Sequence, residues 1–122
     1  MKMFHKKDEG FTLVELMVVV LIIGILVAIA IPVFNAASSS ARQKACFSNQ
    51  RTIEGAVEQY MAADPNNTRP NGYVNTGSVL LANNYIKEVP QCPSGNSSQY
   101  YNYSSASRAT TCPATSNTHG HY

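Results

Sequence analysis

A single carboxylate in the most apolar part of the chain is the first candidate for chemistry. Glu15 is the only charged residue between Phe11 and Asn35, and residues 16–34 hold no ionisable side chain. That stretch is long enough to cross a bilayer as a helix. A charge in such a segment costs roughly 2.5–3.5 kcal/mol at the bilayer centre, so we expect Glu15 to have a function and a partner.

A new amine four residues before Glu15 would supply that partner. The apolar run starts at Phe11, directly after the basic segment MKMFHKKDEG. An ordinary secretory signal has a shorter apolar core and a small-residue cleavage site behind it, and no such site follows this run. The natural processing point is Gly10. Cleavage there would give Phe11 a free α-amino group at the same end of the helix as the Glu15 carboxylate.

The segment KKDEGFTLVELMVVVLIIGILVAIAIP resembles the class III signal of type IV pilins and pseudopilins. The resemblance covers residues 6 to about 34. It implies that a membrane-embedded prepilin peptidase cuts after Gly10 and methylates the amine of Phe11. It also implies that Glu15 pairs with the Phe11 amine of a neighbouring subunit during assembly.

Three cysteines, Cys46, Cys92 and Cys112, are the other reactive side chains. Their spacing is unlike that of a zinc site, because the chain has no paired C-x-x-C. In an oxidising compartment we predict a disulfide between Cys92 and Cys112, which would close a loop of about 20 residues worth roughly 3 kcal/mol. A bond from Cys46 to either of the others would instead tie the head to the long helix. The sequence does not decide between these three pairings, or between any of them and three free thiols.

Little else in the sequence indicates catalysis or a cofactor. It has no phosphate-binding glycine loop, no ordered Ser–His–Asp set and no carboxylate cluster. Asp64 and Glu88 are the only acidic residues beyond the long helix, too few for calcium, which binds several oxygen ligands. His119 and His121, with Cys112, are ligand types for a metal, but such a histidine pair is more often simply part of a tail. We expect no catalytic residue, metal or cofactor.

The chain divides into four predicted parts that together make an α+β fold. They are a leader over residues 1–10, a transmembrane and filament-core helix over 11–34, an amphipathic helix over 35–63, and a small globular head over 64–122. The two helical parts are predicted to form one long helix that packs on a small antiparallel sheet, as in type IV pilins. The resemblance implies that this helix loosens in filaments between Gly24 and Pro32, and both residue types weaken helices.

Helical spacing of apolar residues predicts the side of the long helix that meets the head. The face consists of Cys46, Ile53, Val57 and Tyr60. Charged residues mostly occupy the rest of the circumference, where we expect solvated ion pairs among Arg51, Glu54 and Glu58. Pro65 should end the helix near Asp64, because it disfavours helical backbone in the residue before it.

The predicted head starts with a loop and ends with a hairpin. The stretch from Asp64 to Gly77 is dense in Pro, Asn and Gly, which predicts a loop. Ser78 is placed to cap a short helix that extends through Leu80 and Leu81 to Tyr85. The Tyr- and Thr-rich runs SQYYNYSS and RATTC are typical of a small antiparallel hairpin.

Charge and composition indicate an exported structural subunit. The formal net charge is +2, and the few scattered basic residues argue against strong nucleic-acid binding. The leader carries three lysines against two carboxylates, which by the positive-inside rule places the N-terminus in the cytoplasm. We therefore expect a single-pass protein of the cytoplasmic membrane that becomes part of a cell-surface filament.

The predicted function is that of a structural subunit of a type IV pilus-like filament, polymerised through its N-terminal helix. Its partners would be further copies of itself, the prepilin peptidase and the membrane. The resemblance adds a cytoplasmic assembly ATPase and a membrane platform protein. The alternative within the family is a pseudopilin of a type II secretion or competence system. A ligand-binding filament subunit and a plain signal-anchored protein are the alternatives from other classes.

Overall fold

The structure is a computed structural model that describes residues 10–94 and 99–113. The predictions made for residues 1–9 of the leader lie outside this range. So do those made for His119 and His121.

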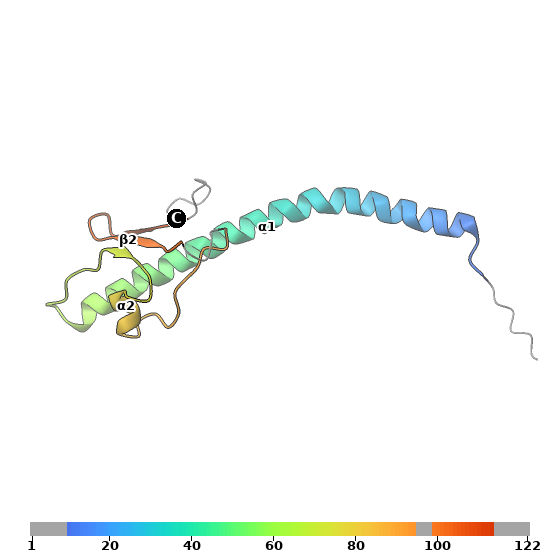
Figure 1. The fold of residues 1–122 in the computed structure, drawn as a ribbon. Coiled ribbons are helices and arrows are strands. Elements are labelled where there is room, and N and C mark those ends of the chain that lie inside the picture. Colours follow the sequence, from blue (N-terminus) through green and yellow to red (C-terminus); the bar gives the residue numbers. More distant parts are fainter. Residues whose placement is uncertain (1–9, 95–98, 114–122) are drawn as a thin grey trace, which may run out of the picture. The chain divides into compact units, whose positions relative to one another are not determined.

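The long helix α1 spans Leu13–Ala63 and passes through both structural units of the chain, Met1–Ala37 and Ser38–Tyr122 (Figure 1). The predicted long helix is thus confirmed, with its start two residues later than expected. It ends before Pro65, as the backbone preference of a residue preceding proline requires. The side-chain amide of Asn67 donates to a main-chain carbonyl in the last turn at 2.7 Å, which satisfies one acceptor that the helix leaves open.

In the first unit, α1 is apolar around its whole circumference. The large apolar side chains from Leu13 to Phe34 all stay exposed, from 46% for Val27 to 74% for Leu13. Within the described residues α1 is the one helix long and apolar enough to cross a membrane. Such a surface needs lipid or other protein to cover it.

The second unit adds a small sheet and a short helix to the remainder of α1. The sheet is antiparallel with the order β1-β2-β3, and α2 lies in the connection between β1 and β2. Their bounds are Gly72–Tyr73 for β1, Val79–Ala82 for α2, Asn102–Ser104 for β2 and Ala109–Thr111 for β3. In the register, Tyr103 of β2 lies between Gly72 of β1 and Thr110 of β3. The predicted α+β fold is therefore confirmed.

Two predictions about the head need correction. Residues 72 and 73 were expected in a loop but form β1, because they pair with Tyr103 and Asn102 across the chain rather than with a local partner. The short helix ends at Ala82, before Tyr85, and the Ser78 side chain makes no capping hydrogen bond. Its Oγ is buried and without a partner among the described atoms, while its main-chain carbonyl accepts from the first turn of α2.

One compact core fills the space between α1 and the head. The predicted face of α1 is confirmed, since Cys46, Ile53 and Val57 are fully buried and Tyr60 packs against them. The head contributes Val74, Leu80, Ile86, Cys92, Tyr101 and Tyr103. Gln50 is also fully buried, which the sequence did not predict, because a polar residue does not mark an apolar face.

Candidate functional site

The N-terminus of α1 is built by a reciprocal cap between Thr12 and Glu15. The Thr12 amide and hydroxyl both donate to Glu15 Oε2, at 2.8 and 2.9 Å, and the Glu15 amide donates to Thr12 Oγ1 at 3.2 Å. This is the capping box, in which a Thr and a Glu three residues apart satisfy each other's backbone donors. It explains why the helix starts at Leu13 rather than at Phe11.

The capping box gives Glu15 a partner before any assembly. Its carboxylate already has two hydrogen bonds from Thr12 within the same chain. The pattern T-x-x-E was visible in the sequence and could have revealed this role. Glu15 thus has one structural partner in the monomer, and any pairing with a neighbouring subunit adds to it.

Gly10 and Phe11 lie just ahead of this cap in exposed positions. Phe11 is 92% exposed, and a side chain added at Gly10 would meet nothing within 4 Å. Phe11 and Glu15 line the same shallow hollow on the surface of the first turns, together with apolar side chains such as Val18. The two residues that flank the predicted cleavage point are therefore both exposed.

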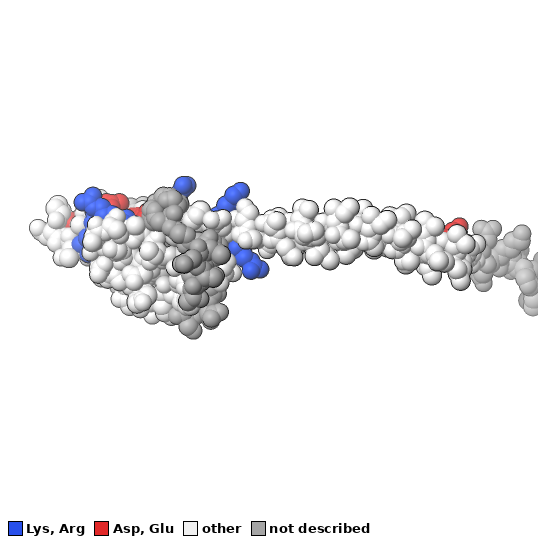
Figure 2. Space-filling model, turned by 90° about the horizontal axis from the view of Figure 1, so that it is seen from above, with Lys and Arg blue, Asp and Glu red and all other residues white. Residues whose placement is uncertain are grey.

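The helix surface that follows carries no other charge until the second unit. Figure 2 shows an uncharged surface along this segment, with one carboxylate near its N-terminal end. The helix continues through Gly24 and Pro32 without a break. The loosening expected between these residues concerns the assembled filament and stays a prediction.

The second unit brings the three cysteines together. Cys46 comes from α1, Cys92 from the loop before β2 and Cys112 from the residue after β3, and their sulfurs all lie within 4.8 Å of one another. The Cys112 sulfur lies 3.1 Å from the Cys92 sulfur. Burial is the main cause that raises the pKa of the Cys46 thiol. The disulfide predicted between Cys92 and Cys112 stays a prediction.

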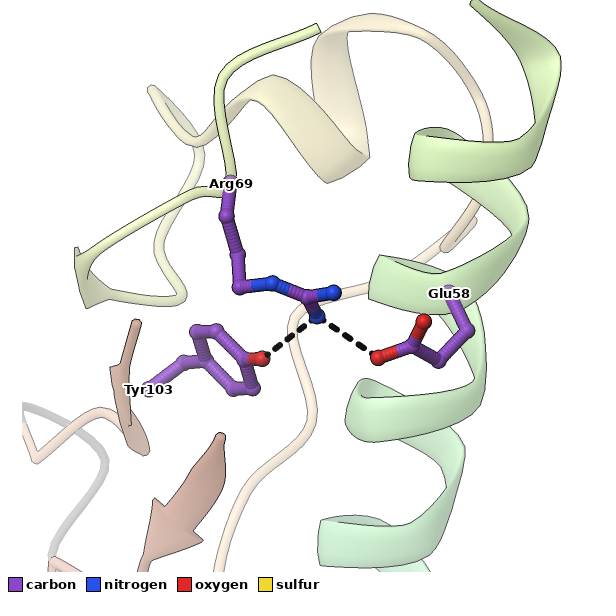
Figure 3. A network of polar contacts seen from close by, with 3 residues as sticks. All are labelled: Glu58, Arg69 and Tyr103. Atoms are coloured by element: carbon purple, nitrogen blue, oxygen red, sulfur yellow. Dashed lines mark hydrogen bonds and ion pairs between the residues drawn. The ribbon is translucent and has the colours of Figure 1, made fainter. Parts of the chain in front are cut away.

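A polar contact ties the loop before β1 to α1 and the sheet. Arg69 Nη1 donates to Glu58 Oε1 at 2.6 Å and to the Tyr103 hydroxyl at 3.2 Å (Figure 3). The hydrogen bond from Arg69 lowers the pKa of the Glu58 carboxyl. Glu54 likewise accepts from the Thr110 amide at 2.8 Å. Both carboxylates therefore bind the head, a role beyond the helix pairs expected among Arg51, Glu54 and Glu58.

Comparison with known proteins places these features in a family. The model of the prokaryotic N-terminal methylation motif matches residues 5–31. The type II secretion system core protein G of Vibrio cholerae is 31% identical over 111 residues, covering 78% of this chain and 71% of that protein. The ComG operon protein 3 homolog of Bacillus licheniformis is 32% identical over 88 residues, which cover 72% of this chain and 84% of that protein. The chain belongs to the type IV pilin and pseudopilin family.

Relatives named as pilins or fimbrial proteins match over a shorter range. The type IV major pilin protein PilA of Myxococcus xanthus is 41% identical over 59 residues, which cover 48% of this chain and 27% of that protein. No solved structure matches the chain at a significant level. The family membership confirms the predicted function: this pilin-like chain is a structural subunit of a pilus-like filament, formed from a membrane-anchored precursor.

Proposed function

We propose that the pilin-like chain is cut between Gly10 and Phe11, methylated on the Phe11 amine, and assembled through the apolar part of α1. In the filament, Glu15 pairs with the Phe11 amine of a neighbouring copy. The observation that carries this proposal is an uncovered apolar helix with one carboxylate, held next to an accessible Gly10. The methylation motif that matches this part of the chain supports the processing step.

The capping box prepares the carboxylate for this role. Both hydrogen bonds from Thr12 go to the same oxygen, Oε2, and fix the carboxylate at the first turn of α1. A carboxylate can accept about four hydrogen bonds, so capacity remains for a neighbour's ammonium group. An anion at a helix N-terminus is also favoured by the helix dipole. Apolar packing between helices then supplies most of the filament's stability, and the charge pair sets their register.

The finer points of export and assembly belong to the same proposal. The positively charged leader supports an N-terminus in the cytoplasm and a head on the outside before assembly. Nothing in the sequence indicates a nucleotide site, so the energy for assembly has to come from other proteins. By the family resemblance these are a cytoplasmic ATPase and a membrane platform protein.

A pseudopilin role is the second candidate, and the coverage of the relatives favours it. The proteins named for type II secretion and for the ComG operon match over more than 70% of this chain, and so include its head. The pilin PilA and the fimbrial protein EcpB of Eikenella corrodens match over 48% and 46% of it. A short periplasmic filament, rather than a long surface fibre, would follow from this alternative.

Intact-protein mass spectrometry of native material tests the processing step. We expect a mature chain that starts at N-methyl-Phe11 in both membrane and sheared-filament fractions. Gly10→Leu should block cleavage and leave the whole precursor in the membrane. Gly24→Ala is the matched control, because an added Cβ there also meets nothing within 4 Å and should leave processing unchanged. A filament subunit that still starts at Met1 would contradict the proposal.

A further inference from the structure

Three sulfurs from distant parts of the chain meet in the core of the second unit. They belong to α1, to the loop after α2 and to the end of the hairpin, and all lie within 4.8 Å of one another. Cys46 and Cys92 are buried, while Cys112 is partly exposed. The three sulfurs are therefore close enough to bind one ion together, with Cys112 as the most exposed of them.

The spacing of the sulfurs fits a thiophilic metal ion. Zinc binds cysteine sulfur at about 2.3 Å, so sulfurs around one tetrahedral zinc lie about 3.8 Å apart. The Cys92 and Cys112 sulfurs, now 3.1 Å apart, would separate slightly, and the widest pair would draw in by up to about an ångström. Three thiolates supply three of the four ligands that zinc takes. Soft sulfur ligands select such ions over magnesium or calcium.

A buried hydroxyl is directed at one of these sulfurs. Tyr101 is fully buried, and its hydroxyl group hydrogen-bonds to the Cys46 side chain. The hydroxyl oxygen also accepts from the Asn49 side-chain amide at 3.2 Å, which leaves its own proton for the sulfur. The same Asn49 amide donates to the Gln91 carbonyl at 3.0 Å, directly before Cys92. Such outer contacts orient metal ligands and stabilise the thiolate form.

We propose that Cys46, Cys92 and Cys112 form a zinc-binding site that fastens the head to α1, with Tyr101 as a positioning residue. A disulfide between Cys92 and Cys112 would use only two of the sulfurs and would not tie either to α1. A zinc ion uses all three and joins three chain segments at one point. The inference does not depend on the assembly role of Glu15, because it concerns the second unit alone.

Metal binding by the full chain tests the proposal. The protein is purified in detergent under reducing conditions without chelator, and zinc is measured by elemental analysis after dialysis. We expect one zinc per chain. Replacement by cobalt should give the thiolate-to-cobalt charge-transfer band and the intense visible bands of a tetrahedral site. This measurement uses the unaltered protein, so it does not depend on whether a variant folds.

Variants then assign the ligands. Cys46→Ala, Cys92→Ala and Cys112→Ala should each abolish binding of one zinc at stoichiometric concentration. Tyr101→Phe keeps all three sulfurs and should weaken zinc binding roughly 10- to 100-fold, as loss of an outer contact does elsewhere. The control is Tyr73→Phe, which removes a hydroxyl from an exposed tyrosine of β1 and should leave zinc affinity unchanged.

Three results would each overturn the proposal. One is a wild-type chain that takes up less than half an equivalent of zinc under reducing conditions. The second is a Cys46→Ala variant that binds zinc as tightly as the wild type. A peptide map of native filaments that joins Cys92 to Cys112, with no zinc present, would equally reject it and would confirm the disulfide instead.

Discussion

The two halves of α1 differ in whether the rest of the chain covers their apolar side chains. In the first unit, residues such as Ile23 are apolar on every side of the helix and remain exposed within the chain. In the second unit, Ile53 lies on a single apolar face that the head covers completely. One continuous helix therefore serves two purposes, because only its second half finds its partners in the same molecule. The first half must find them in lipid or in other copies of the chain.

The carboxylates of the two halves show the same difference. Glu15 is bound by Thr12, three residues away, in a contact that any isolated helix could make. Glu54 and Glu58 are bound by Thr110 and Arg69, which lie 56 and 11 residues away. A locally satisfied charge does not depend on the head, whereas the other two help to define the fold. This contrast makes Glu15 suitable for contacts between subunits.

The largest effect should come from matched isoleucine substitutions in the two halves. Ile53→Ala leaves a cavity in the core and should lower the free energy of unfolding of the head by about 2–5 kcal/mol. Ile23→Ala removes an exposed side chain and should leave that value within about 0.5 kcal/mol of the wild type. Denaturant unfolding in detergent, followed by near-UV circular dichroism, measures both, since all the tyrosines lie in the second unit. If both variants lost the same free energy of unfolding, the head would not be the part of the chain that distinguishes Ile53 from Ile23, and the comparison would be contradicted.

A smaller effect is expected at the cap. Thr12→Ala removes the side-chain half of the capping box and should destabilise the first turn of α1 by about 0.5–2 kcal/mol. Thr12→Ser keeps the hydroxyl and serves as the control. Hydrogen exchange of the amides in the first turn should speed up for alanine only, while exchange in the head stays unchanged. No change in the first turn would show that the cap does not hold the helix start in the membrane.

The smallest effect should be a pH dependence at Glu58. Its pKa is lowered from the ordinary value of 4.5 by the hydrogen bond from Arg69, so the contact stabilises the head above that value. The contribution is lost as pH falls through the folded pKa. Glu58→Gln should therefore unfold at a lower temperature than wild type at pH 7, and the gap should narrow as the pH falls below the ordinary carboxyl pKa of 4.5. Glu88→Gln, at an exposed position, is the control. A gap that widens in acid would contradict this assignment.

Periodicity and local signals predicted the parts of the structure that depend on neighbouring residues. The apolar face with Ile53 and Val57 follows from helical spacing, and the end of α1 follows from Pro65. The hairpin of β2 and β3 follows from runs of strand-forming residues. The cap at Thr12 also has a local signal, T-x-x-E, and could have been predicted in the same way.

Contacts between distant residues escaped prediction. The two residues of β1 form a strand only because Tyr103 and Asn102 pair with them, and nothing local distinguishes them from loop. Arg69 sits in that loop with no sign in the sequence that it reaches Glu58 and Tyr103. The meeting of three cysteines is of the same kind, because their wide spacing gives no motif. For such features the tertiary fold, and not the local pattern, decides.

The most direct test of the assembly role compares Glu15→Val with Glu15→Gln. Valine removes both the charge and the cap, whereas glutamine can still serve in a capping box and removes only the charge. Both monomers should be processed and accumulate in the membrane, because losing the charge favours insertion. Both should form few filaments, since the buried Phe11 ammonium of a neighbour loses its partner at a cost of roughly 3–5 kcal/mol.

Electron microscopy of sheared filament fractions, beside a membrane immunoblot, gives the measurement. Glu88→Gln, which removes a charge from an exposed position of the head, is the control and should assemble normally. The account predicts that glutamine fails at position 15 as valine does. Normal filament numbers from Glu15→Gln alone would show that Glu15 acts only as a helix cap, and would contradict the charge pairing between subunits.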